Sequence, residues 1–289
     1  MNPDDEKGLK YVNLGFGYNR LVDFYSNDMA YGRNDNNSIL DFFEVDANRL
    51  GYHWEDLFDG DYKNPDIPWH LILATQTYLI DSAITGYSYI PSLSPGDRVF
   101  QNHSQTSEGR IGEYVISMAA NFSHKFYLGA TIGIQDVYFD RTVVHSETAH
   151  PANHDNIFFY AEDGNIYYID DRFNSMDHTQ QFTVDGSGYN LKIGGIFRPT
   201  PESRLGIAFH TPTYYKLSEK NSESAVSSFL SGTYNARTPT DKYNYRIESP
   251  YKAIASVGYT FSDVGLVSVE LEYLDYSTAR INKGSDGYQ

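Results

Sequence analysis

Hydrophobic and polar residues alternate along several long stretches of this chain. In residues 126–135 every second residue is apolar, and the residues between them are polar or glycine, apart from Tyr127. The segments 12–19, 189–198 and 267–274 follow much the same pattern. A repeat of two residues places alternate side chains on opposite faces of a β-strand. The pattern therefore predicts strands with one apolar face and one polar or glycine-bearing face.

The predicted strands are joined by connections of two kinds. Short turns are expected at 123–125, 200–202 and 262–265, whereas long acidic, aromatic-rich stretches cover roughly 25–68, 143–180 and 217–242. Short turns on one side and long loops on the other are typical of outer-membrane barrels. The strands also exceed the ~9–11 residues that cross a bilayer at a tilt. Aromatic residues lie beside the short turns, as expected at a membrane interface: Phe122, Phe126, Phe197, Tyr259 and Phe261.

The long stretches carry two local elements of their own. The spacing of apolar residues predicts a helix from Ser38 to Leu50, with Ser38 as its N-cap. Residues 156–170 are predicted to form a small hairpin that turns at Asp163-Gly164.

Composition narrows the possible classes of function. The 289 residues include 26 Tyr and no cysteine, and the formal net charge is −16. The absence of cysteine excludes disulfides and thiolate chemistry, and the acidic charge argues against nucleic acid as a partner. Tyrosine suits boundaries between an apolar phase and water.

Hydropathy does not place the chain in a compartment by itself. No run of ~20 apolar residues is present, which excludes a membrane-spanning helix, but alternating barrel strands also give a low mean hydropathy such as the observed −0.51. The first residues do not form a secretory signal. We therefore expect either a protein that stays inside the cell or a segment of a longer precursor.

Three segments resemble a known family. Residues 188–212 form a Gly-Tyr-Asn strand that turns through Arg-Pro-Thr-Pro into Arg-Leu-Gly-Ile-Ala-Phe, and this hairpin resembles the central hairpin of FadL-type outer-membrane transporters. Residues 249–261 and 6–21 resemble two further strands of that family. The resemblance implies an all-β, antiparallel transmembrane barrel of 14 strands, an N-terminal hatch, and uptake of long-chain fatty acids or other hydrophobic compounds. The family's signal, hatch and closing strands have no counterpart here, so we expect residues 1–289 to be one β-barrel domain, an internal segment of a longer precursor.

The first long stretch holds the best candidates for ligand binding. Its apolar side chains would form a groove that captures a hydrophobic molecule at the outer surface. The alternative is a self-packed core of the loop that binds nothing. The candidate residues are Leu40, Phe42, Phe43, Leu50, Trp54, Leu57, Phe58 and Trp69.

Metal and catalytic sites are weaker alternatives. His145, His150 and His154, together with Glu147 and Asp155, suggest metal or haem ligation, and Asp56, Asp59 and Asp61 faintly resemble a calcium loop. Neither spacing fixes a coordination geometry, so we expect no metal and no cofactor. Glu270 and Glu272 are expected to face a lumen and to pair with Lys192, Arg198 or Arg204. No catalytic motif is present, which favours a protein that is not an enzyme.

The expected function is passive uptake of hydrophobic small molecules, such as long-chain fatty acids, through the outer membrane of a Gram-negative cell. The protein would be a monomer surrounded by outer-membrane lipid. One alternative is a structural, adhesive or haem-binding outer-membrane barrel whose acidic loops bind other molecules. Another is a soluble β-sandwich that binds sugars through Tyr and Trp, in which the apolar faces would pack against each other.

Overall fold

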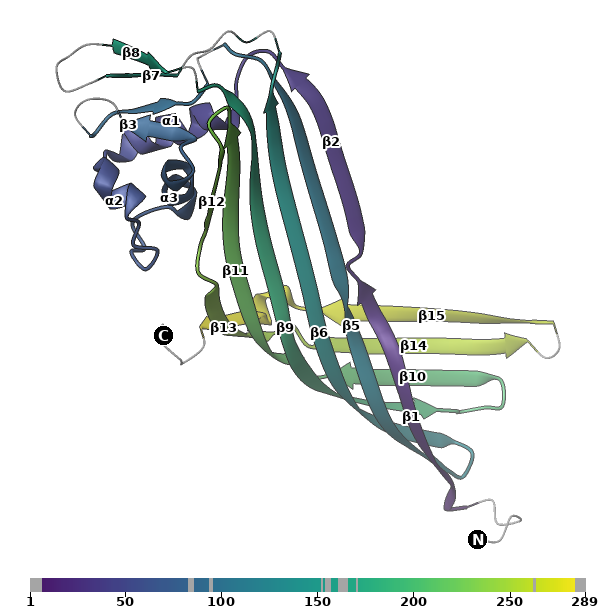
Figure 1. The fold of residues 1–289 in the computed structure, drawn as a ribbon. Coiled ribbons are helices and arrows are strands. Elements are labelled where there is room, and N and C mark those ends of the chain that lie inside the picture. Colours follow the sequence, from purple (N-terminus) through teal and green to yellow (C-terminus); the bar gives the residue numbers. More distant parts are fainter. Residues whose placement is uncertain are drawn as a thin grey trace.

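The protein is an antiparallel β-structure dominated by one large curled sheet (Figure 1). The computed structural model describes residues 7–82, 86–93, 96–151, 153, 157–160, 166–169, 171–261 and 264–283. Seven strands form a continuous path in the order β1-β5-β6-β9-β10-β14-β15. The strands of the path are β1 (Leu9–Asp23), β5 (Val99–Phe122), β6 (Phe126–Ala149), β9 (Phe173–Phe197), β10 (Ser203–His210), β14 (Lys252–Phe261) and β15 (Gly265–Leu274). In the part of the chain that the structure describes, β1 and β15 do not pair with each other.

Five more strands extend the sheet. Strand β2 pairs with the first part of β5, β11 pairs with β9, β12 and β13 pair with β11, and β16 pairs with β13. Their bounds are β2 (Ser26–Asn34), β11 (Tyr214–Phe229), β12 (Thr233–Arg237), β13 (Asp241–Glu248) and β16 (Arg280–Lys283). We call this region, with the ends of β5, β6 and β9 that it pairs with, the upper part of the sheet, and the region of β1, β10, β14 and β15 the lower part.

Three strands run through both parts without interruption. Strands β5 and β6 have 24 residues each and β9 has 25, which corresponds to about 80 Å at 3.3 Å per residue. Their pairing keeps one register from end to end, so the alternation of faces is preserved along them. The turn at 123–125 joins β5 to β6, with Ser123 and His124 in the left-handed region.

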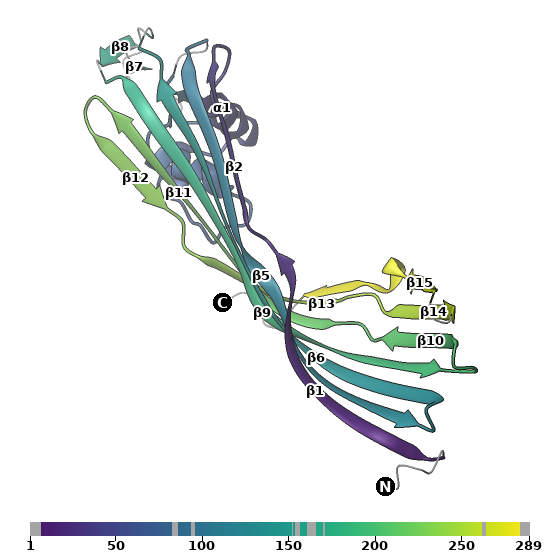
Figure 2. The ribbon, with the colours of Figure 1, turned by 90° about the vertical axis from the view of Figure 1, so that its right-hand side faces the viewer.

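The upper and lower parts separate at β9. The end of β9 near Phe197 pairs with β10, and the rest of β9, up to Tyr189, pairs with β11. The short segment 211–213 lies between β10 and β11, and 249–251 lies between β13 and β14. Figure 2 shows the two parts of the sheet diverging at this level.

A small helical unit packs against the upper part. It consists of α1 (Ile39–Leu50), α2 (Trp54–Phe58), α3 (Trp69–Gln76) and the two-stranded β3 (Ile80–Ser82) and β4 (Tyr89–Pro91). Its core is continuous with the sheet, because Val99, Met176 and Phe229 belong to the same buried cluster as the helices. No helix in the described residues is long and apolar enough to span a membrane.

Several predictions of local structure are confirmed. Ser38 caps α1 and forms a capping box with Asp41, and the turns at 123–125 and 200–202 join neighbouring strands. Strands β7 (Ile157–Tyr160) and β8 (Ile166–Ile169) form the predicted hairpin. Its turn at Asp163-Gly164, residues 262–263 and residues 1–6 lie outside the described residues.

The prediction of long loops is partly wrong. Parts of 25–68 and 143–180 and most of 217–242 continue the sheet, as β2, the end of β6, the start of β9, and β11 to β13, whereas the rest of 25–68 includes α1 and α2. These strands were missed because both of their faces are polar, so they lack the alternation that marks the lower part.

Candidate functional site: the two faces of the sheet

One face of the lower part is a continuous apolar surface. Leu14 lies opposite Met118, and Ile116 lies between Phe16 and Ile132. The same rows continue through β9, β10, β14 and β15. We call this surface the apolar face, and it includes Leu14, Phe16, Ile116, Met118, Leu128, Ile132, Leu191, Ile193, Ile207, Phe209, Val257, Val269 and Leu271.

These side chains are exposed. Leu14 is 79% and Phe16 78% exposed, and Ile207 and Leu271 exceed 70%. In the described residues no second layer covers them, so the arrangement that a β-sandwich requires is absent. An apolar surface that spans seven strands is of the kind that contacts a membrane or a large partner.

Aromatic residues border the apolar face on two sides. On the side toward the upper part, Tyr18 packs on Tyr114 with ring centroids 4.9 Å apart, and Tyr189 packs on Tyr214 at 5.6 Å. Tyr251 and Tyr273 continue this row at 6.3 Å from each other. We call these six residues the tyrosine row.

The second border lies at the short turns. Phe122 is paired with Phe126, whose ring lies 4.7 Å from that of Phe197, and Tyr259 lies 4.9 Å from Phe261. Eight residues separate Tyr114 from Phe122, about 26 Å along the strand. This distance is close to the ~25 Å apolar band of outer-membrane barrels, before tilt is taken into account.

The opposite face of the lower part carries glycine and polar residues, and we call it the polar face. Its centre is Glu113, which is 1% exposed. The Lys192 ammonium donates to both oxygens of this carboxylate, at 2.9 and 2.7 Å, and the side-chain amides of Gln135 and Asn190 donate to Oε1 at 3.0 and 3.2 Å. The Tyr215 hydroxyl in turn donates to Gln135. The network fixes four strands at one level. Because the Lys192 side chain is 29% exposed, removing it should cost less than the about 3–5 kcal/mol that breaking a fully buried pair costs.

Gly133 makes room for this network. A Cβ at this position would lie 2.5 Å from Oε1 of Glu113 and 2.7 Å from the Asn190 amide oxygen. A larger residue at position 133 would collide with the buried Glu113 carboxylate on β5, so the network requires glycine there.

The expected partner of Glu270 and Glu272 is wrong. Both glutamates do lie on the polar face, since they pair in register with Ser256 and Ile254. Glu272 forms its ion pair with Lys252 at 3.0 Å, whereas Lys192 is bound to Glu113. Lys192 of β9 reaches across β6 to Glu113 of β5, whereas Glu270 and Glu272 lie three strands away from it in the other direction, on β15.

An apolar belt crosses the same face above Glu113. The Phe24 ring contacts Phe139 edge-on at 5.2 Å, and Phe139 contacts Phe182 at 6.0 Å. Val184 and Leu217 are buried beside them. Below Glu113, a hollow of about 510 Å³ is lined partly by small residues such as Ala119, Gly129 and Gly194, with Lys192 and His210 among its polar residues.

Above the belt, histidines occupy neighbouring strands. His103 lies opposite His145, and His145 lies opposite His178. His178 pairs with Glu223 at 2.9 Å and its ring contacts Phe43 of α1 edge-on. The helical unit thus covers the polar side of the upper part.

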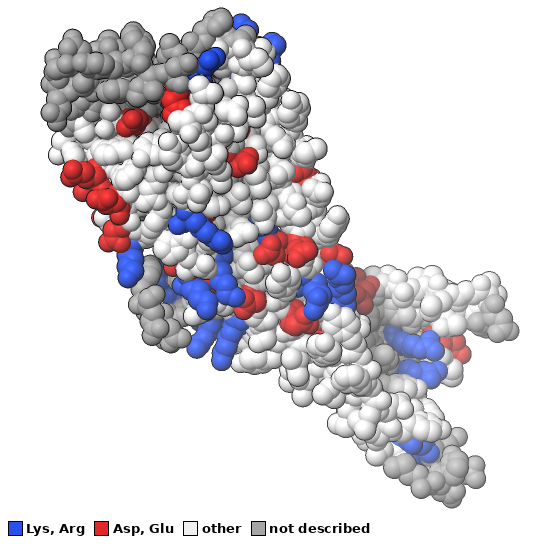
Figure 3. All heavy atoms as spheres, in the orientation of Figure 1, with Lys and Arg blue, Asp and Glu red and all other residues white. Residues whose placement is uncertain are grey.

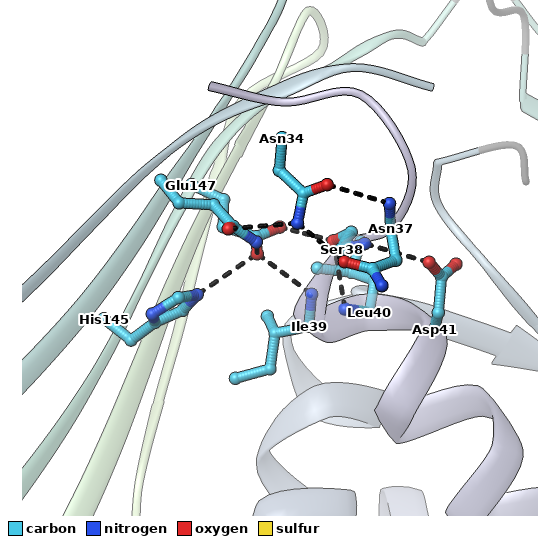
Figure 4. Close-up of polar contacts among 9 residues, drawn as sticks. Asn34, Asn37, Ser38, Ile39, Leu40, Asp41, His145 and Glu147 are labelled. Atoms are coloured by element: carbon cyan, nitrogen blue, oxygen red, sulfur yellow. Dashed lines mark hydrogen bonds and ion pairs between the residues drawn. The ribbon is translucent and has the colours of Figure 1, made fainter. Parts of the chain in front are cut away.

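Glu147 joins the helical unit to the sheet (Figure 4). Its carboxylate accepts hydrogen bonds from the Ser38 hydroxyl, from the Ile39 backbone N–H at 2.9 Å and from the Gln101 amide at 2.7 Å, and His145 lies 3.1 Å away. Burial of the Glu147 carboxyl favours its neutral form, but these hydrogen bonds outweigh burial and lower its pKa. The first turn of α1 is therefore held by a buried carboxylate of β6.

The predicted groove residues do come together, but most face inward. Leu40, Phe43 and Leu57 are buried in the core of the helical unit, and Leu50 and Trp54 pack partly buried against it. Phe58 stacks on Trp54 at 5.4 Å, and Trp69 contacts Tyr62. Phe42 differs from the rest, because it is 55% exposed and lies at 5.5 Å from His70. This packing is what the alternative, a self-packed core of the loop, predicts, except that the Phe42 side chain is exposed. Whether these residues bind a ligand stays a prediction.

The described residues contain no group of three or more His, Cys, Asp or Glu side chains arranged to hold a metal ion. His145 is occupied by Glu147, and His150 lines a separate hollow at the end of β6. His154 and Asp155 lie outside the described residues. Asp56, Asp59 and Asp61 are exposed.

Sequence reasoning missed the Glu113 network and the histidine pairs. A signal was available, because counting outward from the turn at 123–125 places Glu113 opposite Gln135 and His103 opposite His145.

Comparisons with protein-family models, with curated proteins and with solved structures find no match to this chain.

Proposed function

We propose that this sheet is part of an outer-membrane β-barrel that takes up hydrophobic small molecules, such as long-chain fatty acids, by passive diffusion. The observation that carries the proposal is the apolar face, which spans seven strands between two aromatic rows. Lipid is the partner that matches an exposed apolar band of this height.

The asymmetry of the sheet supports an orientation. The short turns, such as 123–125, lie at one aromatic border, and the upper part with its helical unit lies beyond the tyrosine row. In outer-membrane barrels the short turns face the periplasm and the long extensions face the cell exterior. The helical unit would then be exposed outside the cell.

The polar face would line the lumen. In a barrel the two faces of each strand are separated into lipid and interior, and here the interior would carry the Glu113 network, the apolar belt and the hollow beside Gly129. A hydrophobic ligand captured near Phe42 would meet the apolar belt before it reaches the hollow. Burial of the ligand's apolar surface at each stage supplies about 25 cal/mol per Å².

The open edges of the sheet need partners in this setting. Unpaired backbone groups of β1 and β15 would each cost several kcal/mol in lipid. The proposal therefore includes further strands that close the barrel, 14 in total as the resemblance to FadL-type transporters implies.

The test compares two exposed aromatic residues. Fatty-acid binding to the full-length protein in detergent, and its permeation into liposomes, are measured for the natural protein, Phe42→Ala and Tyr31→Ala. Phe42 lies on α1, whereas Tyr31 is 71% exposed on β2, on the other side of the upper sheet. We expect Phe42→Ala to weaken binding at least roughly tenfold, because an aromatic side chain buried by the ligand contributes about 1.5–3 kcal/mol, and Tyr31→Ala to bind normally. Normal binding by Phe42→Ala would remove the helical unit from the uptake path.

A second candidate is a structural or adhesive barrel that only anchors the acidic upper part. The burial of Leu40, Phe43 and Leu57 favours it, because these side chains already have partners. The same liposomes distinguish the two functions, since an anchor would insert but let no hydrophobic tracer through.

A further inference from the structure

Four cations gather on the face of the upper part that continues the apolar face. Lys216 and Lys220 of β11 lie directly opposite Arg246 and Lys242 of β13. Figure 3 shows Lys and Arg gathered over these two strands. We call these four residues the cationic cluster.

The pairing of like charges is unfavourable without an external partner. Directly opposite residues in an antiparallel pair have Cβ atoms about 4.5–5.5 Å apart, and like charges there destabilise the sheet. Lys220 is bound to Asp185 at 2.8 Å. Among the described residues, Lys216, Lys242 and Arg246 have no ion-pair partner, and all three are exposed.

The surroundings leave the cluster net positive. The nearest other charged groups on this face are Asp185 of β9, Glu248 of β13 and Arg280 of β16, which lies opposite Glu248. Farther out in the same rows, Asp136 and Asp140 of β6 lie two strands from Lys216 and Lys220; Asp136 is paired with Arg110 at 3.4 Å, and Glu108 lies opposite Asp140. Arg237 of β12 adds a further cation on this face, so the charge around the cluster stays positive. The whole chain has 22 basic and 38 acidic residues and a net charge of −16. A concentration of cations in such a chain indicates an anionic partner at this place.

The position of the cluster identifies the kind of anion. Lys216 is two residues from Tyr214, which belongs to the tyrosine row, and therefore lies about 7 Å farther along the strand on the same face. Tyrosine rows mark the level of lipid headgroups, and basic residues just beyond that level bind anionic headgroups.

We propose that the cationic cluster binds the phosphate groups of lipid headgroups in the leaflet at the tyrosine row. The inference rests on the proposed membrane placement, but not on uptake of any ligand. Arg246 supplies a planar fork that suits a phosphate, and the lysines supply point charges around it.

The test uses the full-length protein in neutral detergent, titrated with bisphosphorylated lipid A and followed by native mass spectrometry. A dephosphorylated lipid with the same acyl chains and inorganic phosphate are the two further arms. The cluster is weakened in the double variant Lys216→Gln/Arg246→Gln. The control is Lys125→Gln, which removes one exposed cation from the turn at the opposite end of the sheet.

We expect the double variant to bind the bisphosphorylated lipid at least roughly tenfold more weakly and Lys125→Gln to bind it normally. The natural protein should bind the dephosphorylated lipid weakly and inorganic phosphate only at far higher concentration. Unchanged affinity in the double variant, or equal affinity for the dephosphorylated lipid, would overturn the inference. Equal affinity for inorganic phosphate would show an ion site in place of a headgroup site.

Failure of this inference is distinguishable from failure of the proposed function. Reconstitution into liposomes is scored in parallel for the same variants. If the protein inserts but the double variant keeps its lipid affinity, only the inference is lost. If the natural protein does not insert at all, the membrane placement is lost as well.

Discussion

At the scale of single residues, Glu147 has the most demanding position. It is fully buried, and its hydrogen-bond partners come from Ser38 and Ile39, more than 100 positions earlier, and from Gln101 of β5. A buried carboxylate is tolerated because these donors satisfy it. Its charge also suits the N-terminus of α1, where backbone N–H groups are unpaired.

The lowered pKa of Glu147 predicts a pH-dependent attachment of the helical unit. Because the folded-state pKa lies below the ordinary 4.5, the ionised carboxylate contributes stability that is fully present above pH 4.5 and is lost as pH falls through the folded-state value. Protection of α1 against hydrogen–deuterium exchange, expressed relative to the intrinsic exchange rate at each pH, should therefore decrease at acidic pH in the natural protein.

Glu147→Gln should remove most of this pH dependence and weaken the attachment at neutral pH by about 1.5–3 kcal/mol, the value of hydrogen bonds to a charged group. Glu55→Gln, at an exposed position of α2, is the matched control. Identical pH profiles for the natural protein and Glu147→Gln would contradict this role of the carboxylate.

At the scale of elements, Gly109 marks the point where β5 leaves the region of the tyrosine row. Its φ is +137°, and a Cβ there would lie 2.2 Å from the Tyr138 carbonyl oxygen. The Gly109 carbonyl oxygen also accepts a hydrogen bond from the backbone N–H of Phe24, which lies in the interruption between β1 and β2. The glycine therefore allows β5 to pair continuously with β6 on one side while its other side pairs first with β2 and then with β1.

Gly109→Ala should destabilise the sheet by at least about 1–3 kcal/mol, because the backbone conformation is strained for any other residue and the site has no space. Gly32→Ala is the control, since nothing lies within 4 Å of the added Cβ on neighbouring β2. Urea unfolding of the refolded protein in detergent measures both. A midpoint for Gly109→Ala equal to that of Gly32→Ala would show that β5 relaxes at no cost.

The elements differ in how far the sequence predicts them. Alternation identified the lower strands and their two faces, since one face is apolar and the other is not. Beyond the tyrosine row, Ser104 and Thr106 face one side of β5 and His103 and Gln105 the other, so no hydrophobic period remains to indicate a strand. These extensions are stabilised by hydrogen bonds to neighbouring strands. A local sequence pattern carries no information about which strands will pair.

The same limit applies to the candidate site. Contacts across the turn at 123–125 follow from counting residues, as for Glu113 and Gln135. The contact of Lys192 with Glu113 depends on how β6 pairs with β9, and the contact of Ser38 with Glu147 depends on where the helical unit packs. Sequence spacing does not determine either one.

At the scale of the whole molecule, the two faces of one sheet change character at the same level. Below the tyrosine row one face is apolar and the other polar, whereas above it both carry polar groups, with the cationic cluster on one and the histidines and helical unit on the other. A boundary between lipid and water at this row accounts for the change on the apolar face and for the position of the tyrosines.

The most direct test places single labels on the two faces, which the lack of cysteine in the chain makes simple. Ile116→Cys and Ile132→Cys carry spin labels on the apolar face, and Ser117→Cys and Thr131→Cys carry them on the polar face. With the full-length protein in liposomes, we predict that the labels at 116 and 132 are relaxed by oxygen and shielded from a water-soluble nickel complex, and that the labels at 117 and 131 are shielded from oxygen by comparison. Equal or reversed accessibility of the two pairs would contradict the assignment of the apolar face to lipid.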